Sequence, residues 1–253
     1  MAISLDPLGL SPDSLPLTPL CVPQVSPSST EQAAALLQQA DRDRWRLLII
    51  GHGSKVQIPY AESVDLVVST QKLTQIIDHA AGDLTVTAEA GLTFAALQAH
   101  LAPAHQMLAL DPAFPNQATL GGIVATASTG ARRLRYGGVR DMLLGFTLVR
   151  ADGQIAHAGG RVVKNVAGYD LMKLLCGAWG SLGLITEMTW RLYPIPAASA
   201  SLCLPGNAEQ LAQVWTELRT LAPVAADVCL PATSEALGWG QTLSHSCAIS
   251  GYS

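Results

Sequence analysis

The sequence has little charge and few aromatic side chains. Of its 253 residues, 13% are charged and 5% are aromatic, whereas 49% are hydrophobic, so the chain can bury a sizeable core. The net charge of -4 gives the chain no overall electrostatic attraction for a polyanion, whose binding needs clustered Lys and Arg, and this argues against nucleic acid as a ligand. The composition therefore predicts a folded protein whose partner is not a polyanion.

Long apolar runs and paired cysteines are also lacking. No run reaches the roughly 18 apolar residues that a membrane-spanning helix needs. The five cysteines are odd in number and form no C-x-x-C pair, which argues against a disulfide framework, a zinc site or an iron–sulfur cluster held by this chain alone. The histidines show no H-E-x-x-H spacing, so no metal site is expected. Free thiols fit a reducing compartment, and we expect a cytoplasmic protein.

Helical and strand patterns interleave after a leader segment. Residues 1–27 are rich in Pro, Ser and Leu without the basic start of a signal peptide, so we expect a flexible leader there. The patterns predict helices over 28–40, 93–101 and 206–222, strands over 45–50, 64–70, 84–91 and 183–194, and a hairpin over 142–160. Because Pro194 and Pro196 interrupt the chain, we place a domain over 28–196 and a second unit over 197–253.

Three glycine-rich stretches could approach a ligand closely. The first, Gly51–Lys55 (GHGSK), directly follows an apolar strand, and its glycines allow consecutive amides to form an anion nest that suits a pyrophosphate. A plain tight turn is the alternative. The spacing matches neither a Walker A loop nor a Rossmann fingerprint.

The other two stretches are 118–141 and 159–187, where Gly alternates with Ala, Ser and Thr. Their hydroxyls are suitable donors to a polar cofactor, and ordinary loops are the alternative. Since 111–138 consists mainly of small residues and Pro, we expect it to contribute little to a core and to approach a ligand through its backbone.

Two local patterns have competing interpretations. Tyr169 and Lys173 have the Y-x-x-x-K spacing of short-chain dehydrogenases, but the Rossmann turn and the upstream Ser of that site are lacking, so we expect a structural role. Arg132, Arg133 and Arg135 form a basic run. It is either a solvated face or a patch that docks a partner subunit or a carboxylate.

Four motifs occur in a family-specific order. GHGSK, DPAFPNQATLGGIVATASTGARRLRYGGVRD, RVVKNVAGYDLMKL and GSLGLITE resemble the FAD-binding domain of the vanillyl-alcohol oxidase and p-cresol methylhydroxylase (PCMH) superfamily. RRLRYGGVRD and VVKNVAGYDL are similar, more narrowly, to the E-subunit family of bacterial glycolate oxidase. The resemblance implies an α+β fold in which two α/β subdomains clasp an extended FAD. Because family members continue into a complete cap domain, it also implies an incomplete C-terminal cap domain in a truncated or frameshifted chain.

The resemblance also implies a set of site residues but no catalytic residue. The loop matching Gly51–Lys55 would bind the pyrophosphate through backbone amides, and the position of Ile185 would meet the adenine end. The implied cofactor-binding residues are Gly51, His52, Gly53, Ser54, Lys55, Thr119, Leu120, Gly121, Gly122, Thr126, Ser128, Gly130, Gly183 and Ile185. In relatives that tether the flavin from this loop, the histidine takes the place of Ser54, so we expect non-covalent FAD.

The implied function is oxidation of a 2-hydroxy acid, glycolate or D-lactate, with hydride transfer to the flavin. The implied partners are a second FAD-binding glycolate oxidase subunit and an iron–sulfur subunit, through which any attachment to a membrane would occur. The alternative is a non-catalytic flavin-carrying or assembly subunit whose partner oxidises the substrate. An NAD-dependent dehydrogenase is disfavoured, because the dinucleotide fingerprint is missing.

Overall fold

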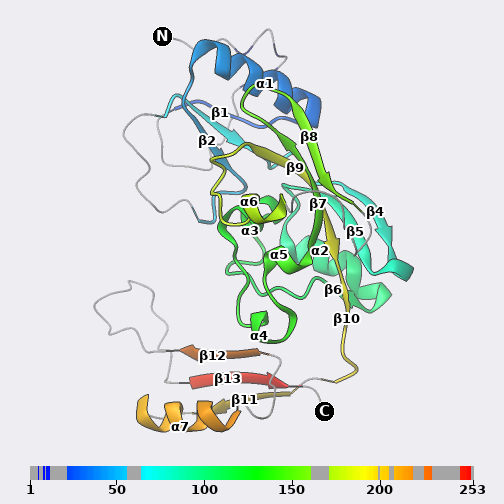
Figure 1. Cartoon of the computed structure of the whole chain (residues 1–253), viewed down its shortest axis with the longest axis vertical. Coiled ribbons are helices and arrows are strands. Elements are labelled where there is room, and N and C mark those ends of the chain that lie inside the picture. The colour runs from blue at the N-terminus through cyan, green and yellow to red at the C-terminus, as the bar shows by residue number, and fades with distance from the viewer. Residues whose placement is uncertain are drawn as a thin grey trace.

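A computed structural model of the chain describes Leu5, Leu8, 10–11, 22–55, 64–160, 171–198, 200–204, 208–218, 225–229 and 246–251. The described strands form a three-stranded parallel sheet, a five-stranded antiparallel sheet, a two-stranded pair and a second three-stranded sheet (Figure 1). Helices pack on the first two sheets, which confirms the α+β class expected from the sequence.

The small parallel sheet is built around β3 and is covered by α1. Its strands have the order β1-β3-β2 and comprise β1 (Gln24–Val25), β2 (Leu47–Ile50) and β3 (Leu66–Ser69). Helix α1 (Thr30–Asp43) begins after Ser29, whose hydroxyl accepts a hydrogen bond from the Gln32 amide at 3.2 Å. Its buried face, which includes Leu36 and Leu37, packs on this sheet and on the neighbouring ends of two strands of the large sheet.

The leader expectation needs a correction at this sheet. Strand β1 lies inside 1–27, and Leu5 and Leu10 are buried in the cluster that contains α1. These residues belong to the folded part because their apolar side chains complete the cover of the parallel sheet. The domain boundary after Pro196 stays a prediction.

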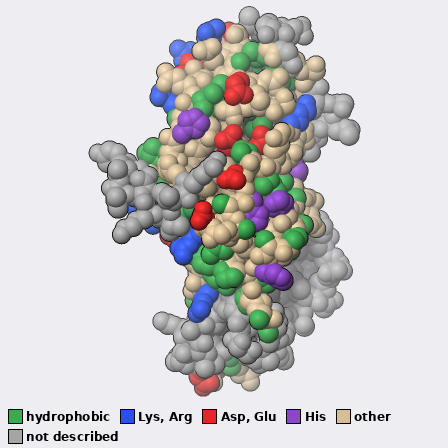
Figure 2. Space-filling view, turned by 90° about the vertical axis from the view of Figure 1, so that its right-hand side faces the viewer, with side chains coloured by type: hydrophobic (Ala, Val, Ile, Leu, Met, Phe, Trp, Pro, Cys, Tyr) green, Lys and Arg blue, Asp and Glu red, His purple; other side chains and the backbone are tan. Residues whose placement is uncertain are grey.

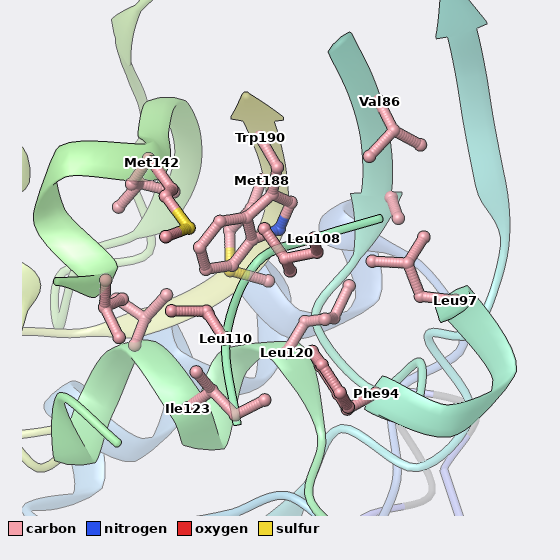
Figure 3. Close-up of a cluster of buried hydrophobic side chains, with 14 of the residues drawn as sticks. Val86, Phe94, Leu97, Leu108, Leu110, Leu120, Ile123, Met142, Met188 and Trp190 are labelled. Carbon is pink, nitrogen blue, oxygen red and sulfur yellow. The ribbon is translucent and has the colours of Figure 1, made fainter. Parts of the chain in front are cut away.

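The large antiparallel sheet provides one wall of the main core. Its order is β4-β5-β9-β7-β8, formed by β4 (Ile76–Ala80), β5 (Thr85–Glu89), β7 (Leu143–Val149), β8 (Ile155–Gly159) and β9 (Leu184–Arg191). Strands β7 and β8 are the predicted hairpin. Side chains alternate across the sheet, so Met188 and Trp190 of β9 point into the core toward Leu110 and Met142 (Figure 3).

The opposite face of the large sheet is polar. The Thr87 and Thr189 hydroxyls share a hydrogen bond of 2.9 Å between β5 and β9, and the Thr147 hydroxyl donates to Glu187 at 3.0 Å. Figure 2 shows the molecule from the side of β4 and β8, where Asp, Glu and His side chains are interspersed with apolar ones. The sheet therefore packs an apolar face on the core and carries hydrogen-bonded polar side chains on the other.

Short helices and two short strands lie between the strands of the larger sheets along the chain. They are the helices η2 (Ala81–Asp83), α2 (Phe94–Leu101), η3 (Ala102–Ala104), α3 (Leu120–Thr126), α4 (Arg133–Tyr136), α5 (Val139–Met142) and α6 (Met172–Leu175), and the paired strands β6 (Gln106–Met107) and β10 (Tyr193–Pro194). The predicted strand over 183–194 is thus divided into β9 and β10, which pair with different strands.

Helix α3 corrects the expectation that 111–138 contributes little to the core. Leu120, Ile123 and Val124 are fully buried, and the first two lie among the core side chains in Figure 3. Their i, i+3, i+4 spacing forms an apolar stripe within a glycine-rich segment. The high content of small residues concealed this stripe.

The C-terminal elements form a separate sheet at the end of the molecule opposite α1 (Figure 1). Strand β13 (Ser246–Gly251) pairs antiparallel with both β11 (Ala200–Leu204) and β12 (Ala225–Cys229). The predicted helix over 206–222 is α7 (Ala208–Leu218). The sequence pattern did not predict β13, because its residues alternate only weakly between apolar and polar.

Candidate cofactor-binding site

A cleft opens at the carboxyl ends of the parallel strands β2 and β3. Its volume is about 730 Å³, a figure that includes the open mouth. The cleft is lined by the end of β2 with the loop to Lys55, by Thr70 after β3, by α3 with its N-cap, and by the start of β9 with the loop before it. Ligands of open α/β sheets bind at this edge of the strands.

The loop Gly51–Lys55 is fixed through a carbonyl and leaves its amides available. The Ser69 hydroxyl donates to the Gly51 carbonyl at 2.9 Å and accepts from the Gln71 amide at 3.2 Å. Among the described residues, no amide of this loop donates a hydrogen bond to another residue. Gly53 has a φ of 73°, which favours glycine and turns neighbouring amides toward one concavity. The loop can therefore accept an anion.

Two buried polar atoms in the cleft have no partner among the described residues. They are the Lys55 ammonium nitrogen and the Thr70 hydroxyl. A buried polar group without a partner is costly, and a buried charge more so. Burial lowers the pKa of Lys55 and also that of His52. An anionic ligand with hydrogen-bond acceptors would satisfy both Lys55 and the free amides of the loop.

The start of α3 supplies a close-packed surface rather than free donors. The Thr119 hydroxyl caps the helix by accepting from the Gly122 amide at 3.2 Å. The amides of Leu120 and Gly121 donate to the Leu92 and Ala90 carbonyls at 2.9 and 2.8 Å. These amides are therefore already used inside the protein, and this wall contributes shape.

Another wall, next to α3, is formed by residues just before and at the start of β9. The Trp179 amide donates to the Ala125 carbonyl at 2.9 Å, which links this loop to α3. In the pairing of β7 with β9, Thr147 lies opposite Glu187 and Leu148 lies opposite Ile185, so Thr186 forms a bulge. The bulge interrupts the side-chain alternation where Leu184 and Ile185 border the cleft.

A family model for an FAD binding domain matches residues 23–159, which is more than half of the chain. The chain belongs to this FAD-binding family. The match confirms the resemblance to PCMH-type domains and identifies FAD as the cofactor.

The FAD-binding domain also has relatives among curated proteins. It is 35% identical over 179 residues to glycolate oxidase subunit GlcE of Escherichia coli (strain K12), covering 68% of this chain and 50% of that protein. It is 33% identical over 184 residues to a D-lactate dehydrogenase of Archaeoglobus fulgidus, covering 72% of this chain and 41% of that protein. The chain thus spans about half, or less, of the length of these relatives.

A solved structure shares the fold. Alkyldihydroxyacetonephosphate synthase superposes with a TM-score of 0.71 at 22% identity, over 82% of this chain and 39% of the other. At this identity the similarity is evidence of the fold alone. It agrees with the expected PCMH-type architecture.

Most of the predicted cofactor-binding residues lie together in the cleft. Those that line it are Gly51, His52, Gly53, Ser54, Lys55, Thr119, Gly121, Gly122, Thr126, Gly183 and Ile185. Their contacts with FAD stay predictions.

Leu120, Ser128 and Gly130 do not line the cleft. The Leu120 side chain is fully buried in the core (Figure 3). Ser128 follows the left-handed C-cap of α3 and donates its amide to the Ile123 carbonyl at 3.0 Å. Gly130 packs so closely on the Asp111 carbonyl that a Cβ would overlap it. Helix α3 thus turns the Leu120 side chain into the core, and the Ser128 amide is used by the helix C-cap.

Several lining residues were not predicted from the sequence. The most informative are Thr70 and Trp179. Thr70 directly follows β3, the strand next to β2, so the pairing of two parallel strands was the signal that could have identified it. Trp179 lies in the third glycine-rich stretch, but no spacing rule distinguished it from a core residue.

The described cleft fits FAD in its chemistry. Free loop amides and Lys55 suit the pyrophosphate, Thr70 can bind a polar edge, and the apolar part of the cleft suits a flat ring.

The described residues contain no group of three or more His, Cys, Asp or Glu side chains that could hold a metal. No helix in the described ranges is long and apolar enough to cross a membrane.

Proposed function

We propose that this chain is the FAD-binding part of an oxidoreductase that oxidises a 2-hydroxy acid, glycolate first and D-lactate second. The observation that carries the proposal is the cleft at β2 and β3. There the loop amides and the Lys55 ammonium have no partner among the described residues and can bind an anion. Its relatives support the substrate class, since they are glycolate oxidase subunits and dehydrogenases of D-lactate and D-2-hydroxyglutarate.

In this proposal, the protein binds the cofactor mainly through its central pyrophosphate. The amides of Gly51–Lys55 and the Lys55 ammonium would bind the pyrophosphate, while Thr119 and the α3 glycines would bring the backbone close to the cofactor. Bound flavin accepts a hydride from the carbon that bears the substrate hydroxyl. The role of the described residues is to bind the cofactor, fix its orientation and exclude water from its buried parts.

The cofactor would be bound without a covalent bond. His52 lies two residues before Ser54, and neighbouring loop residues point in different directions. Ser54 is a poor nucleophile without an adjacent base. Among the described residues, Ser54 has no hydrogen bond to a titratable side chain.

We further propose that electrons leave through a second FAD-binding subunit and an iron–sulfur subunit. The relatives named GlcE and GlcD are subunits of glycolate oxidase, which supports assembly with other chains. Within this assembly, 28–196 would be the FAD-binding domain and 197–253 the start of a cap domain.

A second candidate is a flavin-carrying subunit whose partner oxidises the substrate. The titratable side chains that line the described cleft are His52 and Lys55, and both lie in the proposed pyrophosphate loop. The described cleft therefore supplies no separate base or carboxylate clamp. This observation favours a partner as the source of such groups.

Anaerobic spectroscopy distinguishes these candidates. The purified chain loaded with FAD is mixed with glycolate, and separately with D-lactate, while the flavin absorbance is recorded. Bleaching by either acid supports oxidation by this chain, whereas bound flavin that bleaches only after the partner subunits are added supports the carrier. Failure of the chain to retain FAD would contradict both.

A further inference from the structure

Trp179 is an exposed indole held in an unfavourable backbone conformation. Its side chain is 50% exposed although tryptophan is usually well buried, and it lines the cleft. Its φ is 53°, in the left-handed region that residues other than glycine and asparagine rarely adopt. Such a conformation persists where the surroundings impose it and is frequent at ligand-binding positions. A buried core role does not explain this arrangement.

The backbone around the indole is held by hydrogen bonds to α3. The Trp179 and Gly177 amides donate to the Ala125 and Val124 carbonyls of α3, at 2.9 and 3.0 Å. On the other side, Gly180 packs on Ile49, where an added Cβ would lie 3.4 Å from the Ile49 Cβ. The Trp179 side chain is therefore presented from a backbone that is hydrogen-bonded to α3 and lies close to β2.

The part of the cleft around Trp179 is apolar. Gly180 touches Ile49, Trp179 is bonded to Ala125, and Leu184 and Ile185 follow on β9. The ammonium group and the unpartnered hydroxyl, in contrast, come from Lys55 and from Thr70, while the Thr119 and Thr126 hydroxyls that also line the cleft are already hydrogen-bonded within α3. Of the two ring systems of FAD, the isoalloxazine has more polar edge atoms and needs more hydrogen bonds than adenine. An apolar end with an exposed indole suits a ring that is bound mainly by its faces.

We propose that Trp179 is a cofactor-specificity residue whose indole stacks on the adenine ring of FAD. The inference rests on the proposed position of FAD in this cleft and adds the residue that selects the dinucleotide over FMN. Stacking of a base on an aromatic side chain corresponds to a loss of about 5-fold to about 100-fold in affinity when the side chain is removed.

The test measures binding of three ligands to flavin-free protein. FAD, ADP and FMN are titrated into the wild type, Trp179→Ala and Trp179→Phe, with Trp45→Phe as a control in the α1 cluster. We expect Trp179→Ala to lower the affinity for FAD and for ADP by a similar factor and to leave the affinity for FMN unchanged. Trp179→Phe should lose less affinity. Quenching of tryptophan fluorescence by ADP should persist in Trp45→Phe and disappear in Trp179→Phe.

A second variant separates ligand binding from folding. Because glycine tolerates a positive φ, Trp179→Gly should leave the melting temperature of the flavin-free protein unchanged or raise it, while FAD still binds more weakly. A lower melting temperature with unchanged FAD affinity would overturn the proposal and make Trp179 a structural residue. A lower affinity for FMN with an unchanged affinity for ADP would also overturn the proposal, because it would place the indole at the flavin ring.

The outcomes also separate this proposal from the cleft assignment. If FAD affinity depends on Lys55 but not on Trp179, the stacking contact is wrong and the site stands. If FAD affinity depends on neither residue, the cofactor does not bind in this cleft and both proposals fail.

Discussion

A Cβ atom on Gly51 would overlap the hydroxyl of Thr119, because the loop after β2 touches the N-cap of α3 there. This contact joins two walls of the cleft. The same Thr119 hydroxyl already accepts a hydrogen bond from the Gly122 amide, so it cannot move without uncapping α3.

Gly51→Ala should therefore abolish FAD retention and lower the melting temperature. The added methyl group displaces Thr119, which costs the helix cap about 1 kcal/mol in addition to the distortion of the loop. Gly82→Ala is the matched control, since nothing lies within 4 Å of a Cβ at that position. FAD content and thermal unfolding check both variants. Full FAD occupancy in Gly51→Ala would show that the loop does not hold the cofactor.

Lys55→Met should weaken FAD binding by about 10-fold to about 100-fold, the range for loss of a hydrogen bond to a charged group. Lys55→Arg keeps the charge and should lose less. Burial places the pKa of Lys55 below its ordinary value of 10.5, and the pyrophosphate should raise it again. FAD binding then takes up a proton at alkaline pH, so wild-type affinity should fall as pH rises. Isothermal titration over an alkaline pH series measures this fall. If the affinity of Lys55→Met for FAD falls with pH as steeply as that of the wild type, Lys55 is not the group that takes up the proton.

Thr70→Val should weaken FAD binding without lowering the stability of the flavin-free protein. The Thr70 hydroxyl is buried with no partner among the described residues, so replacing it by a methyl group removes an unsatisfied group. Thr189→Val is the opposite control, because the Thr189 hydroxyl bonds Thr87 at 2.9 Å on the outer face of the sheet. It should cost about 1 kcal/mol of stability and leave FAD affinity unchanged. The idea fails if Thr70→Val binds FAD like the wild type.

Asp65→Asn should remove a pH-dependent part of the stability. Asp65 accepts from the Arg46 side chain at 2.8 and 2.9 Å and from its amide at 2.8 Å, and these bonds hold the pKa of Asp65 well below its ordinary value of 3.8. A lowered pKa adds stability above pH 3.8 that is lost as pH falls through the folded-state value. The difference in melting temperature between wild type and Asp65→Asn should be small, because the pair is exposed, and should shrink in acid. If the difference in melting temperature instead grows as the pH falls, the ionised Asp65 does not stabilise the fold in the way proposed.

Acid precipitation should leave the flavin in the supernatant and the pellet colourless. Hydrogen bonds and ring burial are lost when the fold is lost, whereas a covalent bond would survive. A yellow pellet with a flavin-modified peptide that contains His52 would show a tether and contradict the loop assignment.

The interleaved fold was predictable because its elements carry strong local signals. Ser29 caps α1, the β7–β8 hairpin has a turn at Asp152 and Gly153, and β2 is a short apolar run. Helix α3 and strand β13 escaped prediction, since glycine masks the apolar stripe of α3 and β13 depends on pairing with distant strands.

The loop of the candidate site was predictable, but the groups that complete the cleft were not. Gly51–Lys55 is recognisable as a glycine turn after a strand. Thr70 joins it only because β2 and β3 pair in parallel, and Trp179 joins it only because its loop bonds to α3. Leu120 was included because the family resemblance implies contacts along Thr119–Gly122, and the structure shows that the helical period turns its side chain into the core.

A crystal structure of the chain with FAD tests the central claim most directly. We expect pyrophosphate oxygens within hydrogen-bond distance of the Gly51–Lys55 amides and of the Lys55 ammonium, with no covalent bond to His52. A cofactor bound elsewhere, with this loop empty and Lys55 still without a partner, would contradict it.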